Sequence, residues 1–500
     1  MFNSISFNDP RIVILPRLND DSVYKHTSEN RPALNLPVPG VPVVQTAEVV
    51  YLPPVNGERM STTGTTLAKS NPNGACIEKG TWTTLPNPVP AATNFVFTPS
   101  SEGSMTFHLV GCSGDPGRTR PGLAVAGGMV SQIAKAVSPA VAPSFLYHLG
   151  DIAYTTSGHA MTGGLWNTQF YAQYTAYVDG NGPLPIFAIA GNHDGNAGKG
   201  SDTEIAHFEQ NMCGTAGAVS PDNKTDTRTE STLPYPYWRL DTPLAWIIGL
   251  YTNVSNGGVL DDPKKHKHPK DGPQYKWLVD QLSYCKAQNA SGTPRAILLA
   301  LHYPPYNGTL DFHQRGNPTY GNDNDYKHAV PIGMVLQEAF AKSGQIPDAI
   351  FSAHAHLYQR ITLSYNDSHG NPVQQVPCFV VGCGGHTQLE LMATLCAGGT
   401  GTGFPAAPFN LFTQGTPPKG LSAPKNATVM IEFYADGTNQ NNQPYGFLTV
   451  TLTPGDAATH PTLVCQFFIT PCDSAGNAVN PGAVCLADFC TLDLTTHLLV

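Results

Sequence analysis

Five short apolar runs in the middle of the chain each end at a cluster of polar residues. Their length and their content of Leu, Ile, Val and Phe are typical of buried β-strands. They are Met105 to Val110, Ser144 to Leu149, Leu184 to Ile189, Arg295 to Leu301 and Ala349 to Phe351. Four stretches with apolar residues at helical spacing lie between them: 122–137, 166–177, 272–288 and 330–342. This alternation predicts βαβ units around a largely buried sheet, with ligands gathered just beyond the carboxyl ends of the strands.

The segments that flank this core, residues 105–390, have a different pattern. Residues 1–104 are rich in Pro, Asn and Thr and contain only short extended runs, which predicts an N-terminal extension of strands and loops. Residues 391–500 begin with a Gly- and Pro-rich loop and continue with runs of strand composition. We therefore predict an α/β fold with a mainly extended N-terminal extension and a β-rich C-terminal part.

Composition limits the partners that the chain can have. Its 500 residues are 41% hydrophobic, enough for a packed interior, and the formal net charge of −9 argues against a broad nucleic-acid surface. Because no apolar stretch approaches about 18 residues, we expect no membrane span. The N-terminus also lacks an export signal, so the cytoplasm is the default expectation. Two polar segments, 195–236 and 307–327, are the expected walls of a substrate mouth.

The chain contains 11 cysteines, an odd number that argues against a fully paired set. Four of them lie close together near the C-terminus: Cys465, Cys472, Cys485 and Cys490. They fit two disulfides in an exported protein or ordinary buried thiols, and the sequence leaves both readings open.

Metal-capable side chains follow each of the five apolar runs. The pair His354 and His356 comes after the last run, and side chains two residues apart on extended backbone point the same way. The other runs lead to Cys112 and Asp115, to Asp151 and Tyr154, to Asn192 and His193, and to His302. Singly, each has a structural reading, such as a core aromatic for Tyr154, a turn residue for Asn192 or a capping histidine for His193. Their joint occurrence at strand ends favours a metal site.

Four motifs follow one another along the chain: Gly-Asp-x-x-Tyr at Gly150, Gly-Asn-His-Asp at Gly191, His-Tyr-Pro-Pro-Tyr at His302 and His-Ala-His at His354. In this order they resemble the motifs of the calcineurin-like metallophosphoesterases. Tyr154, three residues after the aspartate, narrows the resemblance to the purple acid phosphatase branch. The resemblance covers about half of the chain. It implies a layered β-sandwich of mixed sheets flanked by helices, to which the C-terminal strands add edge strands.

The resemblance also implies a site for two metal ions, Fe(III) together with Zn, Fe or Mn(II). Asp151 would link both ions, with Tyr154 and His356 on the first. Asn192, His302 and His354 would hold the second. His193 is then expected to stabilise or protonate the leaving oxygen, and His313 resembles the other histidine that the family places near the substrate.

The chain departs from the family at the first strand, where the family carries an aspartate directly after Gly. Here Cys112 follows Gly111, and Asp115 stands three residues further on. We expect Asp115 to supply the ligand, because a hard Fe(III) centre prefers oxygen and a cysteine would make the site soft and sensitive to oxidation.

The resulting hypothesis is an acid phosphatase-like phosphomonoesterase that uses a metal-bound hydroxide on a phosphorylated small molecule. No nucleic acid or membrane partner is expected, and the sequence does not decide the oligomeric state. One alternative is a phosphodiesterase or nuclease on the same metal pair. Another, suggested by Cys112, is a metal-poor binding protein without catalysis.

Overall fold

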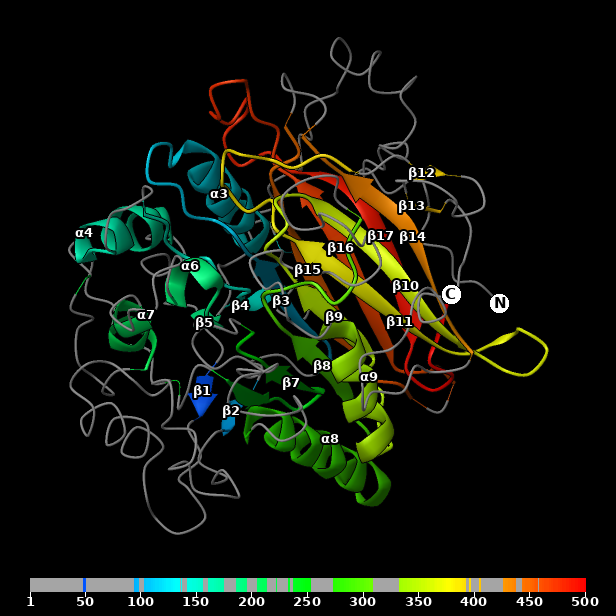
Figure 1. The fold of residues 1–500 in the computed structure, drawn as a ribbon. Helices are drawn as coiled ribbons and strands as arrows, with labels where there is room; N and C mark the ends of the chain where they lie inside the picture. The colour runs from blue at the N-terminus through cyan, green and yellow to red at the C-terminus, as the bar shows by residue number, and fades with distance from the viewer. Residues whose placement is uncertain are drawn as a thin grey trace.

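The computed structural model arranges the apolar runs in two packed β-sheets (Figure 1). It describes residues 48–50, 94–98, 103–134, 136, 142–155, 161–174, 186–195, 205–213, 222, 233, 237–252, 273–308, 332–392, 395–396, 404–405, 426–437, 443–456 and 458–500. One sheet has nine strands in the order β1-β2-β6-β7-β8-β9-β11-β10-β14. The other has seven, in the order β18-β17-β16-β15-β3-β4-β5.

The strands of the nine-stranded sheet are β1 (Glu48–Val50), β2 (Asn94–Thr98), β6 (Trp238–Asp241), β7 (Ala245–Gly249), β8 (Ala296–Ala300), β9 (Ala349–Ser352), β11 (Pro372–Val381), β10 (Tyr358–Asn366) and β14 (Ala427–Ala435). Those of the seven-stranded sheet are β18 (Leu498–Leu499), β17 (Cys485–Asp493), β16 (Thr462–Ile469), β15 (Gly446–Thr453), β3 (Met105–Val110), β4 (Pro143–His148) and β5 (Ile186–Ala188). A separate pair joins β12 (Leu395–Cys396) to β13 (Phe404–Pro405).

The helices lie outside the two sheets. The longer ones are α3 (Arg120–Ala134), α7 (Ile205–Met212), α8 (Pro273–Ser291) and α9 (Ile332–Ser343), and the short ones are α4 (Gly163–Trp166), α6 (Asn192–Gly195) and the π-helical turn η3 (Asn167–Tyr171). Helices α8 and α9 lie side by side along the nine-stranded sheet, whereas α3 lies near β3 and β15 of the other sheet (Figure 1). No helix in the described ranges is long and apolar enough to cross a membrane.

Parallel pairing brings the carboxyl ends of the predicted strands to one edge. In the seven-stranded sheet β3, β4 and β5 run parallel, and in the nine-stranded sheet β7, β8, β9 and β11 do. The two sets of ends are tied together, since Gly111 N–H donates to the Val381 carbonyl over 3.0 Å. Residues that follow strands of different sheets therefore meet at this edge.

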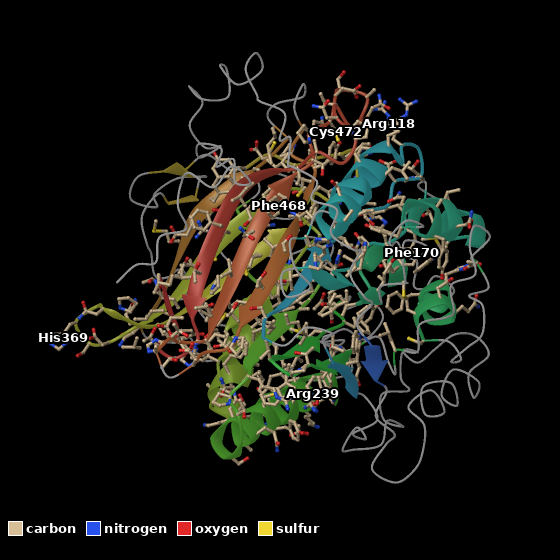
Figure 2. The ribbon with its side chains drawn as sticks, turned by 180° about the vertical axis from the view of Figure 1, so that it is seen from behind. Arg118, Phe170, Arg239, His369, Phe468 and Cys472 are labelled. Carbon is tan, nitrogen blue, oxygen red and sulfur yellow. The ribbon has the colours of Figure 1, made fainter. Side chains whose placement is uncertain are left out.

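Further along the sheets, a buried polar cluster joins the same two layers. Asp488 of β17 accepts hydrogen bonds from Arg360 Nε over 2.8 Å and from Tyr358 OH over 2.9 Å, both in β10. The Tyr358 ring also stacks on Phe467 of β16, with centroids 3.7 Å apart. Seen from behind, His369 lies at the tip of the β10–β11 hairpin, at the far end of these strands (Figure 2).

The structure confirms the layered α/β fold and the five central strands. It differs in the C-terminal part, where β14 joins the edge of the nine-stranded sheet but β15 lies inside the other sheet, between β16 and β3. Strand β16 also lies inside that sheet, between β15 and β17, so the prediction that the C-terminal strands add edge strands is wrong for β15 and β16. Strands β10 and β17 were not predicted. Polar residues interrupt the apolar residues of β10, and β17 mixes apolar with acidic and sulfur-containing residues, so neither forms a continuous apolar run.

Three of the C-terminal cysteines, Cys465, Cys472 and Cys490, are buried thiols that form no disulfide. Cys465 and Cys490 are register partners across β16 and β17, and both are buried. This arrangement agrees with the buried-thiol reading for these three cysteines.

Candidate metal centre

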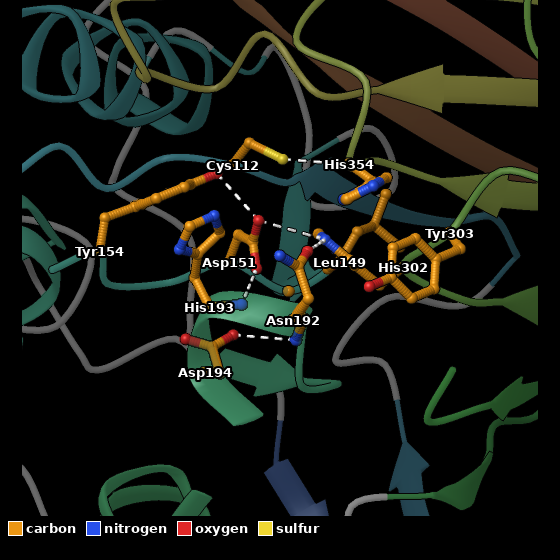
Figure 3. A network of polar contacts seen from close by, with 12 residues as sticks. Cys112, Leu149, Asp151, Tyr154, Asn192, His193, Asp194, His302, Tyr303 and His354 are labelled. Atoms are coloured by element: carbon orange, nitrogen blue, oxygen red, sulfur yellow. Dashed lines mark hydrogen bonds and ion pairs between the residues drawn. The ribbon is translucent and has the colours of Figure 1, made fainter. Parts of the chain in front are cut away.

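Five strand ends from both sheets meet at one site (Figure 3). Each strand delivers one polar side chain within a few residues of its last residue: Cys112 after β3, Asp151 after β4, Asn192 after β5, His302 after β8 and His354 after β9. The sequence motifs predicted this gathering, and the fold brings these five residues together. All but Asn192 are buried, with at most 5% of each residue exposed.

Three of these residues have left-handed backbones. The φ angles are 51° at Cys112, 53° at Asp151 and 65° at His354. Such a conformation costs a residue with a side chain roughly 1–2 kcal/mol, and it persists only where the surroundings enforce it. Three of them at adjacent strand ends mark the site as one whose side-chain directions are maintained against local preference.

The turn that carries Asp151 is supported from behind. His148 Nδ1 accepts a hydrogen bond from Gly150 N–H over 3.2 Å, so the neutral ring carries its proton on Nε2 and donates to Ser113 Oγ over 2.8 Å. Gly150 itself has a φ of 92°. At Gly191 a Cβ atom would come within 2.2 Å of Asp151 Oδ1, so only glycine permits this approach of the β5 end.

Asp151 lies at the centre of the contacts. Its Oδ2 accepts from Tyr154 OH over 3.0 Å and lies 3.2 Å from His302 Nε2, and its Oδ1 accepts from His193 N–H over 2.8 Å. Burial acts to raise the pKa of this carboxyl, but the nearby His302 and His193 and the hydrogen bonds lower the pKa well below its usual value. Asp151 is therefore an anion with Tyr154 and His193 on one side and His302 on the other.

Two of the predicted histidine ligands are oriented by backbone carbonyls. His302 Nδ1 donates to the Leu149 carbonyl over 2.8 Å, and His356 Nδ1 donates to the Gln388 carbonyl over 2.9 Å. In a neutral ring this leaves the lone pair on Nε2. His302 Nε2 then faces Asp151 and His356 Nε2 lies 3.1 Å from Tyr154 OH, the arrangement by which proteins orient imidazole ligands.

The remaining predicted ligands complete the cluster. Asn192 Oδ1 lies 3.0 Å from His302 Nε2. The ring of His354 lies between His302 and Tyr303, with centroid distances of 5.0 Å and 4.2 Å. Figure 3 shows Tyr154 and His193 on one side of Asp151, and His302 with His354 on the other.

The structure reverses the expected choice between Asp115 and Cys112. Asp115 Oδ1 accepts from the backbone N–H groups of Gly117 and Arg118, and its Oδ2 accepts from the N–H and the hydroxyl of Thr387. Both oxygens are thus used in holding loops. Cys112 Sγ instead accepts from His354 N–H over 3.2 Å and faces the cluster.

The donor set fits a metal ion. Ligand atoms of Cys112, Asp151 and His302 lie within 4.8 Å of one another. Burial acts to lower the pKa of His302, but Asp151 raises it overall, so a protonated Nε2 can donate to the Asp151 and Asn192 oxygens when no metal is bound. In a neutral ring Nε2 is an acceptor like these two oxygens, and a cation among the three atoms would then take the place of the proton. Carboxylate, imidazole, amide and thiol groups are ordinary ligands of Zn, Fe or Mn.

Three supporting residues were not given a role from the sequence. Asp194 accepts from the N–H groups of Gly191 and Ile152 and so clamps two strand ends; burial and the charge of Asp151 raise its pKa to about 7. Gln169 of η3 brackets Tyr154 by accepting from its N–H and donating to its carbonyl, each over 2.8 Å. No sequence pattern points to Gln169, because the contact depends on where the π-helical turn packs.

The third is His386, which follows β11 in a Cys-Gly-Gly-His turn. Its ring centroid lies 4.4 Å from that of Tyr154 and 4.2 Å from that of His356. Burial lowers its pKa to about 4. The rule that found the other site residues, a polar residue just after an apolar strand, also applies here and would have identified it.

The two histidines predicted near the substrate have different outcomes. The ring of His193 packs against Tyr154 with a centroid distance of 4.3 Å, so it lies beside the cluster as expected. His313 lies outside the described residues. Its role stays a prediction.

The segment that carries most of the site residues matches a known family of proteins. Residues 114–358 match the family model of the calcineurin-like phosphoesterases. This segment is similar to the calcineurin-like phosphoesterases. The match begins at Gly114 and so includes Asp115 but not Cys112. In the structure Asp115 is hydrogen-bonded to Thr387, whereas Cys112 Sγ accepts from His354 N–H at the cluster. A search of curated proteins found no match.

Solved structures also resemble the chain at low sequence identity. One is described as "GAP50 the anchor in the inner membrane complex of Plasmodium"; it is 12% identical, and the alignment covers 77% of this chain and 90% of that chain with a TM-score of 0.40. Another is described as "Structure of PhoD"; it is 13% identical, with 81% and 73% covered and a TM-score of 0.42.

Proposed function

We propose that this protein hydrolyses phosphate monoesters with the help of two metal ions. The observation that carries the proposal is the position of Asp151. One of its carboxylate oxygens contacts Tyr154 OH on one side and His302 Nε2 on the other, at 3.0 Å and 3.2 Å. A buried carboxylate between two groups of ligand atoms is suited to bridge two cations.

Each ion has a set of donors. Tyr154, His356 and Cys112 would hold the first ion, and Asn192, His302 and His354 the second, with Asp151 shared. The oxygen and imidazole donors suit Fe(III) beside Zn, Fe or Mn(II), while the sulfur adds a soft ligand that also suits zinc. The tyrosine among these donors supports placing the protein in the purple acid phosphatase branch of the family.

The reaction consumes one water and one phosphate ester and releases an alcohol and phosphate. When bound, the cations would polarise a phosphoryl oxygen and lower the pKa of an attacking water. The protein's own contribution is placement, because the strand ends set the direction of every ligand. His193 is held by its backbone N–H to Asp151, with its ring against Tyr154, and is the group placed to donate a proton to the leaving oxygen.

The substrate class that we propose is a phosphorylated small molecule. The net charge of −9 disfavours a polyanionic nucleic acid, which is recruited by clustered Lys and Arg. A phosphodiester substrate is the alternative on the same site, and a metal-poor binding protein is the alternative that Cys112 favours.

The test combines metal analysis with turnover on one purified sample. Bound metal is measured after dialysis, and hydrolysis of an aryl phosphate monoester is compared with that of the matching diester. Asp151→Asn should keep the fold but lower monoester turnover by at least about 100-fold, because the shared anion is lost. His302→Ala should likewise remove nearly all turnover, and His369→Ala, at the exposed hairpin tip, is its matched histidine control.

Each outcome selects one reading. Two bound ions and faster monoester turnover that depends on Asp151 support the proposal. Faster diester turnover selects the diesterase. A protein that binds no metal, or one that is loaded with two ions and hydrolyses neither ester, overturns catalysis at this site.

A further inference from the structure

A loop from the nine-stranded sheet lies beside the predicted metal ligands. After β11 the chain crosses the end of β3, where Gly384 N–H donates to the Gly111 carbonyl over 3.1 Å and His386 N–H donates to the Cys112 carbonyl over 3.0 Å. The approach is tight, since a Cβ atom at Gly385 would meet the Ser113 carbonyl oxygen at 2.5 Å. The backbone of His386 is thereby fixed beside the predicted ligands.

Asp115 supplies the next restraint. Its Oδ2 accepts from Thr387 N–H over 3.1 Å and from Thr387 Oγ1 over 2.5 Å, while its Oδ1 is held by Gly117 and Arg118 N–H. The carboxylate is thus committed to the residue next to His386. The aspartate that the sequence offered as a ligand is a clamp for this loop.

The same loop connects His386 to His356. The Gln388 carbonyl accepts from His356 Nδ1 over 2.9 Å, and Gln388 N–H donates to His386 Nδ1 over 3.3 Å. Because His386 Nδ1 accepts, a neutral ring carries its proton on Nε2. Within the described ranges no group accepts a hydrogen bond from that Nε2.

The Nε2–H group of His386 is therefore a hydrogen-bond donor that is held in place and has no acceptor among the described residues. The ring is half-buried, and it packs on Tyr154 from one side while His193 packs on the same tyrosine at 4.3 Å. A ring that served only to fill space would not need its backbone, its Nδ1 and its neighbour Thr387 to be fixed separately. An anionic ligand at the metal centre would supply the missing acceptor.

We propose that His386 is a further catalytic residue, which donates a hydrogen bond from Nε2 to a phosphoryl oxygen of the bound substrate, and that Asp115 positions it through Thr387. The proposal rests on the proposed phosphatase function. It assigns to His386 and Asp115 roles outside the set of metal ligands.

The test compares three variants of the full chain after metal loading. His386→Phe keeps a ring and removes the donor, His386→Gln keeps a donor, and Asp115→Asn weakens the clamp. Inorganic phosphate is titrated into each protein by calorimetry, and kcat and KM are measured with an aryl phosphate. Bound metal is measured in parallel, and His369→Phe controls for loss of a histidine elsewhere.

We expect His386→Phe to weaken phosphate binding and to lower kcat/KM by about 10–100-fold each, the usual effect of losing one hydrogen bond to a charged group. His386→Gln should recover part of the phosphate affinity and part of kcat/KM. Asp115→Asn should lower both quantities, as His386→Phe does, but by a smaller factor. Metal content should stay at the wild-type level in all three. His369→Phe should behave as wild type.

The opposing results are distinct. If His386→Phe binds phosphate as tightly as wild type, the ring only fills space and the proposal is overturned. If it loses metal, His386 is a ligand and the proposal is equally overturned. Failure of the phosphatase function itself shows as a metal-loaded wild type without turnover, and phosphate binding then still tests the contact of His386.

Discussion

The backbone N–H of His354 donates a hydrogen bond to the sulfur of Cys112 over 3.2 Å. This contact joins the ends of β9 and β3, which belong to different sheets. It also holds the thiol beside Asp151 and His302, in the place where we expected the carboxylate of Asp115. A metal bound here would take sulfur as one of its ligands.

Replacement of Cys112 should therefore affect metal binding more than replacement of Asp115. Cys112→Ser is expected to weaken the affinity for Zn(II) or Co(II) by about 10–100-fold or more. Loss of a group that only orients a metal ligand already costs this much, and Cys112 would bind the metal directly. Asp115→Asn should retain the metal. Competition with a chelator measures both affinities, and Cys378→Ser, a buried cysteine of β11, is the matched control.

Cobalt provides an independent readout for the same pair. Wild type loaded with Co(II) should show a sulfur-to-metal absorption band in the near ultraviolet, and Cys112→Ser should not. If the band survives in Cys112→Ser, or if Asp115→Asn is the variant that loses metal, the assignment of Cys112 is wrong.

A second prediction concerns colour. Burial and the charge of Asp151 raise the pKa of Tyr154 well above 10 in the metal-free protein, so the phenol is neutral there. Direct bonding to Fe(III) would hold it as phenolate and produce a violet or pink absorption. Tyr154→Phe, loaded with Fe(III), should lose this band yet keep measurable turnover, because Asp151 and the histidines remain.

The colour of the iron-loaded protein is read by visible absorption spectroscopy, with iron content determined on the same sample. Cys112→Ser serves as the control that separates tyrosine from sulfur bands. An iron-loaded, oxidised wild type without the band would remove the case for tyrosinate ligation.

A third prediction is a pH dependence of stability far from the metal centre. His497 Nδ1 lies 2.7 Å from Asp348 Oδ1, and this hydrogen bond, with the charges of Asp348 and Asp493, raises the pKa of His497 above 6.5. A raised pKa in the folded state means that the stabilisation is complete below about pH 6.5 and is lost as the pH rises through the folded-state pKa.

His497→Asn should therefore lower the melting temperature at pH 5.5 and have little effect at pH 9. Asparagine tolerates the φ of 56° at this position, so the substitution tests the charge and not the backbone. Since the His497 side chain is 42% exposed, we expect only about 0.2–1 kcal/mol. A larger effect at pH 9 than at pH 5.5 would contradict the assignment; His369→Asn is the control.

The fourth prediction concerns the buried ion pair between the sheets. Asp488→Leu leaves the guanidinium of Arg360 without its carboxylate in a site where the two side chains are 13% and 6% exposed. The free energy of unfolding should fall by about 3–5 kcal/mol. The double variant Arg360→Met with Asp488→Leu should recover most of it, because no charge is then left buried.

Chemical denaturation of the two single variants and the double variant gives the coupling energy between the two residues. Tyr358→Phe removes only the hydrogen bond from the Tyr358 hydroxyl to Asp488. It therefore measures the contribution of this hydroxyl to the free energy of unfolding. Strictly additive effects of the Arg360 and Asp488 substitutions would show that the pair is not coupled.

The amino-acid sequence alone determined which strands carry the site. A buried strand reveals itself by a short apolar run, and the residue that follows it must leave the sheet at a known edge, so Asp151, Asn192, His302 and His354 could be placed together without a structure. The order of their motifs also indicated the family. These inferences use local pattern and the rules of parallel sheets, both of which are encoded in short segments.

Only the tertiary structure decided which of two nearby side chains faces the site and what else surrounds it. The choice of Cys112 over Asp115 depends on a contact to His354, 242 positions away, and on hydrogen bonds from Thr387, 272 positions from Asp115. The placement of His386 and Gln169 likewise depends on how loops from distant segments pack. Side-chain direction at a strand end is set by these long-range contacts against the local backbone preference, as the left-handed φ of 51° at Cys112 shows, and no short stretch of sequence records them.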